Sequence, residues 1–253
     1  MQKPFCVDQL RVLICDTPEE LGVTAARESA EHLKALLATA AEADVIFAAA
    51  PSQNEFLDCL SRAQGIDWSR IQAYHMDEYL GLDKTAPQRF SHYLDEHIFS
   101  KVPFRKINYL DPQDEAQLDV YRAKFQHGSA DVCFMGIGEN GHIAFNDPAE
   151  ADLFDPHCLK QVDLDETCRR QQVHDGCFAS LEDVPQKALS LTVPTLLRSS
   201  RLFCMVPGAA KADAVREMLY GPINMTCPAS SLRLHARATL YLDRDSAKYV
   251  ELR

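Results

Sequence analysis

A histidine, a carboxylate and two amides lie within eight residues of the chain, at Asn140, His142, Asn146 and Asp147. An imidazole has an ordinary pKa of about 6.5, so it can take up and release protons near neutral pH. A polar loop held by its own hydrogen bonds would also contain such residues. The buried, strand-like run before them and the glycines nearby favour a site that transfers protons.

Glycines precede that histidine in the order G-x-G-x-x-G, directly after the apolar run at 131–135. This is the order of a dinucleotide-binding loop, but such a loop needs a helix to begin inside it. Pro148 follows soon after, and a helix cannot easily continue through a proline. We therefore expect no nucleotide cofactor. Gly138 and Gly141 are expected to form a tight turn or to let the backbone approach a ligand.

Two adjacent acids, Asp77 and Glu78, follow the strand-like run at 71–75. Acids in this position can cap a helix or lie in a solvated turn. A carboxylate at the end of a strand can also remove a proton from carbon. The residues alone leave these interpretations open.

The chain carries a net charge of −11, which disfavours nucleic acid as a partner. An anionic substrate would therefore need a local group of positive charges or backbone N–H donors. Lys211 lies at the start of the helix expected after 202–206, and Ser52 and Gln53 lie at the start of another. Both helix starts could attract an anion. The alternative for Lys211 is a surface lysine whose amine lies in water.

Strand-like and helix-like segments alternate along the chain. Thr17 with Glu20, and Ser52 with Glu55, have the spacing of capping boxes at helix starts. The alternation predicts an α/β fold in one domain over 1–253, with a mostly parallel sheet covered by helices on both faces. Such sheets bind ligands beyond the carboxyl ends of their strands. Strands are expected at 11–15, 44–50, 71–75, 131–135, 202–206 and 239–242, and helices from 17, from 52, and at 88–99, 113–125 and 209–219.

The nine cysteines are scattered singly, with no C-x-x-C pair. This spacing argues against a zinc ribbon, a redox motif and a disulfide framework. No apolar run is long enough to span a bilayer, and residues 1–8 lack a signal-peptide pattern. We therefore expect a cytoplasmic protein with no membrane partner, in which Cys133 and Cys204 are small apolar side chains of buried strands.

These motifs resemble those of the glucosamine-6-phosphate deaminase family. That family carries M-D-E-Y-x-G-L, the loop G-x-G-x-x-G-H-I-A-F-N-E-P, a V-P segment that ends in T-L-L, and P-A-S-x-L-x-L-H. The corresponding residues here are 76–82, 136–148, 184–197 and 228–235, in the same order. Several motifs at consistent spacing are more specific than any one of them.

The resemblance implies a Rossmann-like fold and the conversion of an amino-sugar 6-phosphate to a ketose 6-phosphate and ammonia. Asp77 would be the base that moves the C2 proton to C1, and His142, oriented by Asp147, would assist ring opening. Lys211 would hold the phosphate, and no metal would be needed. Asn140 is grouped with the catalytic residues, and the further candidates for substrate binding are Ser52, Gln53, Glu78, Gly138 and Gly141.

The chain departs from the family pattern at several places. Asn140 stands where the family often has aspartate, and Asp147 is shorter than the family's glutamate. The segment 51–55 lacks the glycines of the family's phosphate loop. The family's phosphate-binding arginine has no evident counterpart, and Arg169 or Arg170 could substitute for it.

Two other functions fit parts of the sequence. A 6-phosphogluconolactonase shares the Gly-His loop but would hydrolyse a lactone, and the segments 77–79 and 143–148 favour the deaminase. The altered phosphate loop permits a non-catalytic sugar-phosphate sensor, although Asp77 and His142 argue against it. A phosphorylated amino sugar is the expected partner, and a homo-oligomer is a candidate assembly.

Overall fold

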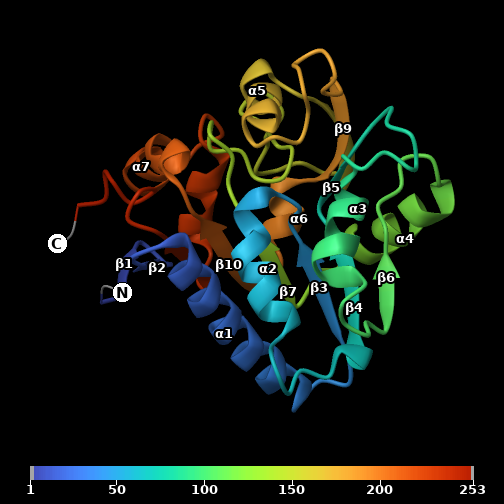
Figure 1. The fold of residues 1–253 in the computed structure, drawn as a ribbon, viewed down its shortest axis with the longest axis horizontal. Coiled ribbons are helices and arrows are strands. Elements are labelled where there is room, and N and C mark those ends of the chain that lie inside the picture. The colour runs from blue at the N-terminus through green and yellow to red at the C-terminus, as the bar shows by residue number, and fades with distance from the viewer. Residues whose placement is uncertain (1–2, 252–253) are drawn as a thin grey trace.

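The computed structural model describes residues 3–251, and an eight-stranded sheet forms its centre (Figure 1). The strands lie in the order β1-β2-β11-β10-β7-β3-β4-β6. Every neighbouring pair is parallel except β1 and β2, which confirms the expected mostly parallel sheet. These strands are β1 (Phe5–Val7), β2 (Leu10–Ile14), β3 (Ala43–Phe47), β4 (Ile71–His75), β6 (Lys106–Asn108), β7 (Val132–Met135), β10 (Arg201–Val206) and β11 (Ala238–Leu242).

Helices cover both faces of this sheet, as predicted. Helices α1, α2 and α3 pack on one face, where they bury strand residues such as Phe47 and Phe134. Helices α4, α6 and α7 pack on the other, against residues such as Ile46 and Cys133. Neighbouring residues of one strand thus point to opposite faces, as the two-residue repeat of a strand requires. The helices are α1 (Pro18–Leu37), α2 (Asn54–Ser61), α3 (Phe90–Leu94), α4 (Glu115–Phe125), α5 (Glu166–His174), α6 (Val193–Leu197) and α7 (Ala212–Tyr220).

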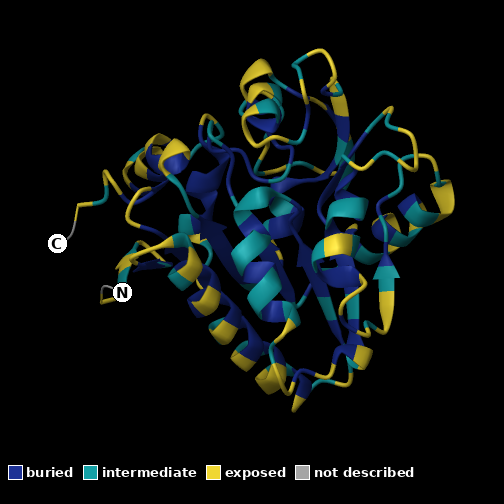
Figure 2. Ribbon diagram, viewed as in Figure 1, coloured by how far each residue is buried: buried dark blue, intermediate teal, exposed yellow. Residues whose placement is uncertain are grey.

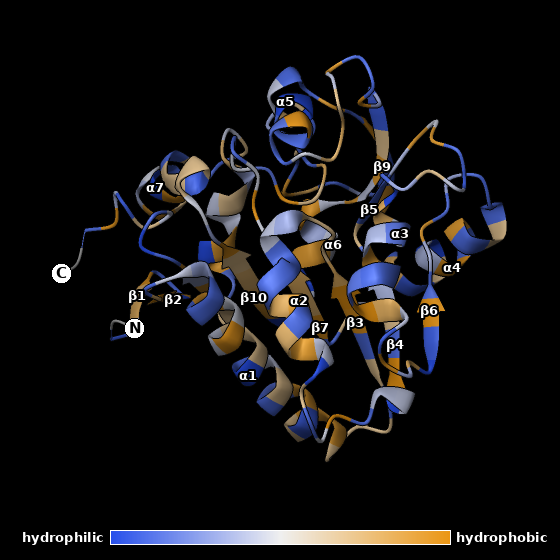
Figure 3. Cartoon of the chain, in the orientation of Figure 1, coloured by the Kyte–Doolittle hydropathy of each residue, from blue (hydrophilic) through white to orange (hydrophobic). Residues whose placement is uncertain are grey.

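A second, antiparallel sheet lies together with α5 at the top of Figure 1. It pairs β5 (Asp77–Tyr79) with β9 (Lys187–Leu191), and β9 with β8 (Leu159–Asp163). The central strands of the large sheet are buried (Figure 2), whereas α5 carries mostly hydrophilic residues (Figure 3). Neither α5 nor the small sheet was expected from the sequence, because short polar segments lack the apolar repeat that predicts an element.

The large sheet has a switch in connection direction between β3 and β7. From β3 the chain continues through β4 to β6 on one side, and from β7 it continues through β10 to β11 on the other. In parallel sheets a crevice opens at such a switch point, beyond the carboxyl ends of the strands. The loops expected to carry chemistry follow β3, β4, β7 and β10, so they begin at this edge.

Two of the expected helix starts differ in the structure. Thr17 caps α1 as predicted, because its Oγ1 accepts the N–H of Glu20. Ser52 forms no capping box, because Pro51–Gln53 is a 3₁₀ turn and α2 begins at Asn54 without a side-chain cap. Ala209–Lys211 is likewise a 3₁₀ turn that precedes α7.

The two helices expected between β4 and β7 are shorter than predicted. The segment 88–99 consists of α3 followed by the π-helical turn Asp95–Phe99. The segment 113–125 becomes helical at Glu115, with Asp114 as its N-cap. None of the helices within residues 3–251 is long and apolar enough to cross a membrane.

Candidate active site

A cavity lies at the switch point of the sheet. Its walls come from the segments that follow β3, β4 and β7, and from α5. Asp77 and His142 therefore line the same cavity, at the same edge of the sheet. The predicted site residues that line it are Ser52, Gln53, Asp77, Gly138 and His142.

Asp77 begins β5, directly beyond the end of β4, and its side chain is only 6% exposed. Burial, together with the smaller effect of the negative charge on Glu78, raises the pKa of Asp77 well above its ordinary value. Its proton affinity is thus higher than that of a surface aspartate. Such a carboxylate is suited to taking a proton from carbon and then returning it.

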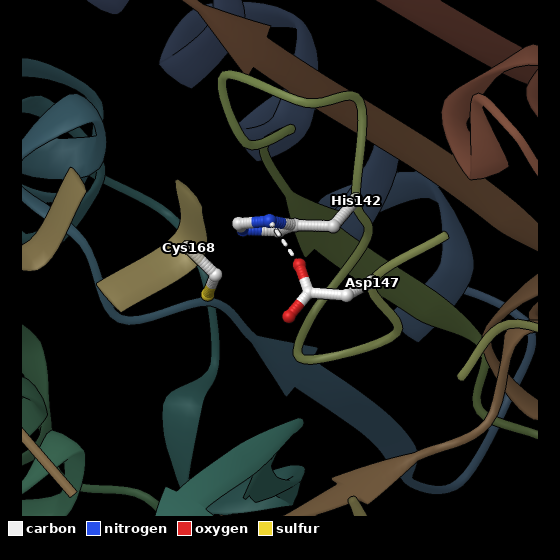
Figure 4. Close-up of side chains that lie close together, drawn as sticks. All are labelled: His142, Asp147 and Cys168. Atoms are coloured by element: carbon white, nitrogen blue, oxygen red, sulfur yellow. Dashed lines mark ion pairs between the residues drawn. The ribbon is translucent and has the colours of Figure 1, made fainter. Parts of the chain in front are cut away.

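His142 reaches the cavity from the loop after β7, and its ring lies against Gly138. A Cβ atom on residue 138 would come within 2.1 Å of the imidazole, so a larger residue would displace the ring. The Nδ1 atom of His142 lies 3.0 Å from Oδ1 of Asp147 (Figure 4). This is a close ion-pair contact, but it is not aligned as a hydrogen bond. Gly138 therefore makes room for the histidine, and Asp147 lies where it can orient the ring.

The carboxylate of Asp147 is fully buried and is kept ionised by its neighbours. Burial opposes the charge, but His142, the Asn140 amide at 3.0 Å and the Asp165 backbone N–H at 3.2 Å together favour it. The pKa of Asp147 therefore lies below its ordinary value. This is the state that an acid needs to stabilise a protonated imidazole.

Asn140 was grouped with the catalytic residues, but it does not line the cavity. Its Nδ2 atom donates to Asp147 and to Oδ2 of Asp165, at 3.0 Å each. Its Oδ1 atom accepts the backbone N–H of His142 at 3.0 Å. An amide can make these contacts without carrying a charge beside two acids, so the structure gives Asn140 a supporting position.

Glu78, which was predicted to bind substrate, is not among the residues that line the cavity. Its fully buried carboxylate accepts the N–H groups of Phe90 and Ser91, both at 3.1 Å, at the start of α3. It also lies 3.5 Å from Nε of Arg89. A carboxylate at a helix N-terminus stabilises the helix, so Glu78 caps α3.

Gly141, which was also predicted to bind substrate, is not among the residues that line the cavity. Its φ of +80° is a left-handed conformation that glycine adopts without strain. A Cβ atom there would come within 2.6 Å of Sγ of Cys227. Glycine is therefore required at this position by the turn and by packing.

Ser52 and Gln53, which were predicted to bind substrate, line the cavity. The Nε2 atom of Gln53 donates to Oγ of Ser52 at 3.2 Å and to the carbonyl of Met205 at 3.3 Å. Met205 is near the end of β10, the strand that leads to Lys211. The two segments expected to attract an anion, after β3 and after β10, are therefore in contact.

Lys211 is a buried lysine rather than a surface one, with only 6% of its side chain exposed. Its Nζ atom has no hydrogen-bond partner within the part of the chain that the structure describes. Burial lowers the pKa of Lys211, although the negative charges of Asp175 and Glu139 partly oppose this effect. Lys211 is not among the residues that line the cavity. A buried ammonium without a partner is costly, and an anion would remove that cost.

The two arginines proposed as phosphate ligands do not line the cavity, which corrects that expectation. Arg169 donates to the carbonyls of Leu181 and Val184, and Arg170 is exposed and pairs with Glu166. The next two residues of α5, Gln171 and Gln172, line the cavity instead. These two glutamines carry no signal in the sequence, because nothing in a polar helix marks which side faces a ligand.

Both glutamines are held by the protein. Gln171 accepts the backbone N–H of Glu139 at 2.9 Å and donates to Asp175 at 3.2 Å. Gln172 accepts the hydroxyl of Tyr79 at 2.7 Å. The wall formed by α5 therefore presents neutral amides to the cavity.

The chain is similar to known proteins over most of its length. A family model described as glucosamine-6-phosphate isomerases/6-phosphogluconolactonase matches residues 16–241. Glucosamine-6-phosphate deaminase 1 of Bacillus subtilis (strain 168) is 30% identical over 249 residues, which cover 94% of this chain and 98% of that protein.

Solved structures agree with this assignment. A monomeric glucosamine-6-phosphate deaminase superposes with a TM-score of 0.83 at 31% identity, covering 94% of this chain and 98% of the other. The 6-phosphogluconolactonase of Trypanosoma brucei superposes with a TM-score of 0.76 at 14% identity, covering 95% and 98%, and this shows a shared fold. The chain therefore belongs to the family of glucosamine-6-phosphate isomerases and 6-phosphogluconolactonases.

Proposed function

We propose that the chain is an amino-sugar-phosphate deaminase that converts an amino-sugar 6-phosphate to a ketose 6-phosphate and ammonia. The observation that carries this proposal is the shared cavity of Asp77, a buried carboxylate with a raised pKa, and His142, an imidazole beside an ionised aspartate. Relatives named glucosamine-6-phosphate deaminase, at 30% identity over nearly the whole chain, support it.

The reaction begins with the closed sugar ring. His142 moves the proton between the anomeric hydroxyl and the ring oxygen, so that the ring opens to the aldehyde. Asp147 keeps its charge close to Nδ1 and stabilises the imidazolium that forms during this transfer.

The second step is the isomerisation. Asp77 removes the proton from C2, whose acidity is raised by the neighbouring C1 aldehyde, and an enol-amine forms. Asp77 then returns the proton to C1, which gives a ketose imine at C2. Its raised pKa suits both halves of this transfer, because the carboxyl group must first accept the proton and then release it. Water adds to the imine and ammonia leaves, which makes the net reaction a hydrolysis.

The phosphate is proposed to lie where the segments after β3 and β10 meet. Ser52 and Gln53 line this side of the cavity, and the buried ammonium of Lys211 follows β10. Lysine and the free N–H groups of a turn are the groups that bind phosphate in proteins. The other wall presents Gln171 and Gln172, so Lys211 would carry the positive charge of this subsite.

Incubation with glucosamine 6-phosphate tests the proposal directly. Ammonia and a ketose 6-phosphate should appear in equal amounts, and Asp77→Asn should slow the formation of both by about 10²–10⁴-fold while the variant remains folded. A parallel assay with 6-phosphogluconolactone separates the alternatives: lactone hydrolysis without ammonia release would identify a lactonase. Binding of the amino sugar without either reaction would identify a sensor.

We further propose that the enzyme works in the cytoplasm, which the nine free cysteines support, since thiols persist in a reducing compartment. The expected homo-oligomer stays a prediction. Size-exclusion chromatography with light scattering tests it: a dimer or larger assembly would agree, and a monomer, the state named for one structural relative, would contradict it.

A further inference from the structure

His142, Asp147 and Cys168 bring three potential metal ligands together (Figure 4). Each residue offers one nitrogen, oxygen or sulfur atom, and the three atoms lie within 4.8 Å of one another. The three residues are 7%, 0% and 1% exposed, respectively. Cys168 comes from α5, whereas the other two come from the loop after β7. No spacing in the sequence therefore indicates the cluster.

The distances are close to those of a tetrahedral zinc site. Ligand bonds of about 2.0–2.1 Å to nitrogen and oxygen and about 2.3 Å to sulfur place the ligand atoms about 3.3–3.6 Å apart. Nδ1 of His142 already lies 3.0 Å from Oδ1 of Asp147. The sulfur, at most 4.8 Å away, has to approach by about 1 Å.

Two further features suit the cluster to a cation. Nδ1 of His142 is buried and faces Oδ1 of Asp147 at 3.0 Å, so both atoms can direct lone pairs at one ion once any proton on Nδ1 is released. The carboxylate of Asp147 is held by Asn140 and by the N–H of Asp165. Hydrogen bonds of this kind, from an outer shell, orient the ligands in metal sites.

We propose that a thiophilic divalent cation of the Zn²⁺ class binds to Nδ1 of His142, Oδ1 of Asp147 and Sγ of Cys168 and inhibits the enzyme. A nitrogen, an oxygen and a sulfur ligand together suit Zn²⁺ and disfavour Mg²⁺ and Ca²⁺, which take oxygen ligands. The proton of the Cys168 thiol and any proton on Nδ1 are released to solvent when the ion binds. Since His142 lines the cavity, the ion can enter from there, and water or substrate would complete its coordination.

The inhibition rests on the proposed function of His142. A cation on Nδ1 fixes the imidazole as a neutral ligand and occupies the atom that faces Asp147. The ring then no longer forms the imidazolium that Asp147 stabilises, so ring opening should slow. No step of the proposed mechanism uses a metal, and a chelator should therefore restore activity.

Titration of the full-length protein with Co²⁺ tests binding without any assay of turnover. The parent protein should develop the near-ultraviolet charge-transfer absorption of a thiolate–cobalt bond and the visible bands of a tetrahedral site, and Zn²⁺ should displace both. Cys168→Ser should lose the thiolate band. Cys177→Ser, which alters a half-buried cysteine just beyond the end of α5, is the matched control and should retain it.

Inhibition is then measured with Zn²⁺ on each protein, relative to its own activity in chelator. Losing a group that merely supports a ligand costs about 10–100-fold in metal affinity, so Cys168→Ser should raise the half-inhibiting Zn²⁺ concentration at least as much. Equal inhibition of the parent and Cys168→Ser would overturn the proposal, as would a cobalt spectrum without a thiolate band. Absence of any deaminase activity would refute the proposed function, while the cobalt titration would still decide the site.

Discussion

His75 holds the backbone of Asp77 in place. The Nδ1 atom of His75 lies 2.9 Å from the carbonyl oxygen of Asp77, and its Nε2 atom lies 2.8 Å from the backbone nitrogen of Leu110. The Leu110 N–H can only donate, so Nε2 accepts and the ring proton is on Nδ1. The fully buried ring is therefore a neutral tautomer that joins the end of β4 to the segment after β6. Burial lowers the pKa of His75, which keeps it neutral.

Replacing the imidazole of His75 should alter the position of Asp77 but leave its carboxylate chemically unchanged. His75→Phe fills a similar volume but leaves the Asp77 carbonyl and the Leu110 N–H unpaired, at about 1–3 kcal/mol of unfolding free energy for each group. Denaturant unfolding measures this loss. We expect kcat to fall more than KM rises, with the pH profile unshifted, and His75→Asn to recover part of the loss by donating to Asp77. A shifted pH profile would show that His75 itself transfers protons.

Asp77→Asn should reduce kcat by about 10²–10⁴-fold, the usual contribution of a positioned base. The amide keeps the shape of the side chain but cannot accept the C2 proton, so KM should change much less. Exchange of the C2 hydrogen with solvent deuterium, followed by NMR, measures the step directly. Exchange at the parent rate would show that Asp77 has only a structural role.

The raised pKa of Asp77 also predicts how stability depends on pH. Because the pKa is higher in the folded state than in the unfolded state, the carboxyl group destabilises the fold as pH rises through the interval between the two values. Asp77→Asn should therefore be more stable than the parent at pH 7. This advantage should vanish near pH 4, about the unfolded pKa of aspartate.

Thermal unfolding at both pH values measures the effect, and Asp245→Asn, on the exposed surface, is the control. Asp77 must be ionised to act as a base. On the acidic side, kcat/KM should therefore begin to fall at a pH above the ordinary pKa range of a carboxyl group. A stability difference that did not depend on pH would contradict the raised pKa.

His142→Gln should slow the reaction of the closed ring more than that of an open-chain substrate. Glutamine can hydrogen-bond to the sugar but cannot take up or release a proton near neutral pH. Comparing kcat for glucosamine 6-phosphate with the rate for an analogue that cannot close its ring separates the two steps. Equal losses on both substrates would place His142 in the isomerisation step as well.

Lys211→Ala should raise KM for the sugar phosphate and weaken inhibition by inorganic phosphate, because it removes the buried positive charge proposed for this subsite. The change in kcat should be smaller. Lys101→Ala removes an exposed lysine and should leave both constants unchanged. An unchanged KM in Lys211→Ala would show that the phosphate binds elsewhere in the cavity.

The sequence alone was enough to predict a mostly parallel sheet and to identify Asp77 and His142, the two residues proposed to carry the chemistry. Each long strand is an apolar run, and strand–helix alternation requires a parallel sheet, whose carboxyl ends lie at one edge. Asp77 and His142 each follow such a strand, so the topology alone brings them to the same cavity.

Only the tertiary structure decided what the neighbouring residues do. Glu78 is adjacent to Asp77, yet it caps α3, because successive residues of an extended segment point in opposite directions. Arg169 donates to backbone carbonyls, and Gln171 and Gln172 line the cavity instead. In a polar helix, no apolar stripe marks the buried side, so the sequence has no signal for which residues face a ligand.

The burial of Lys211 and the meeting of Cys168 with His142 also depend on contacts between distant segments. Local sequence determines which segments become strands and helices, because propensity and periodicity act over a few residues. The environment of a charge or a thiol depends on which segments pack around it. That packing is fixed only when the sheet and the layers above its carboxyl edge come together.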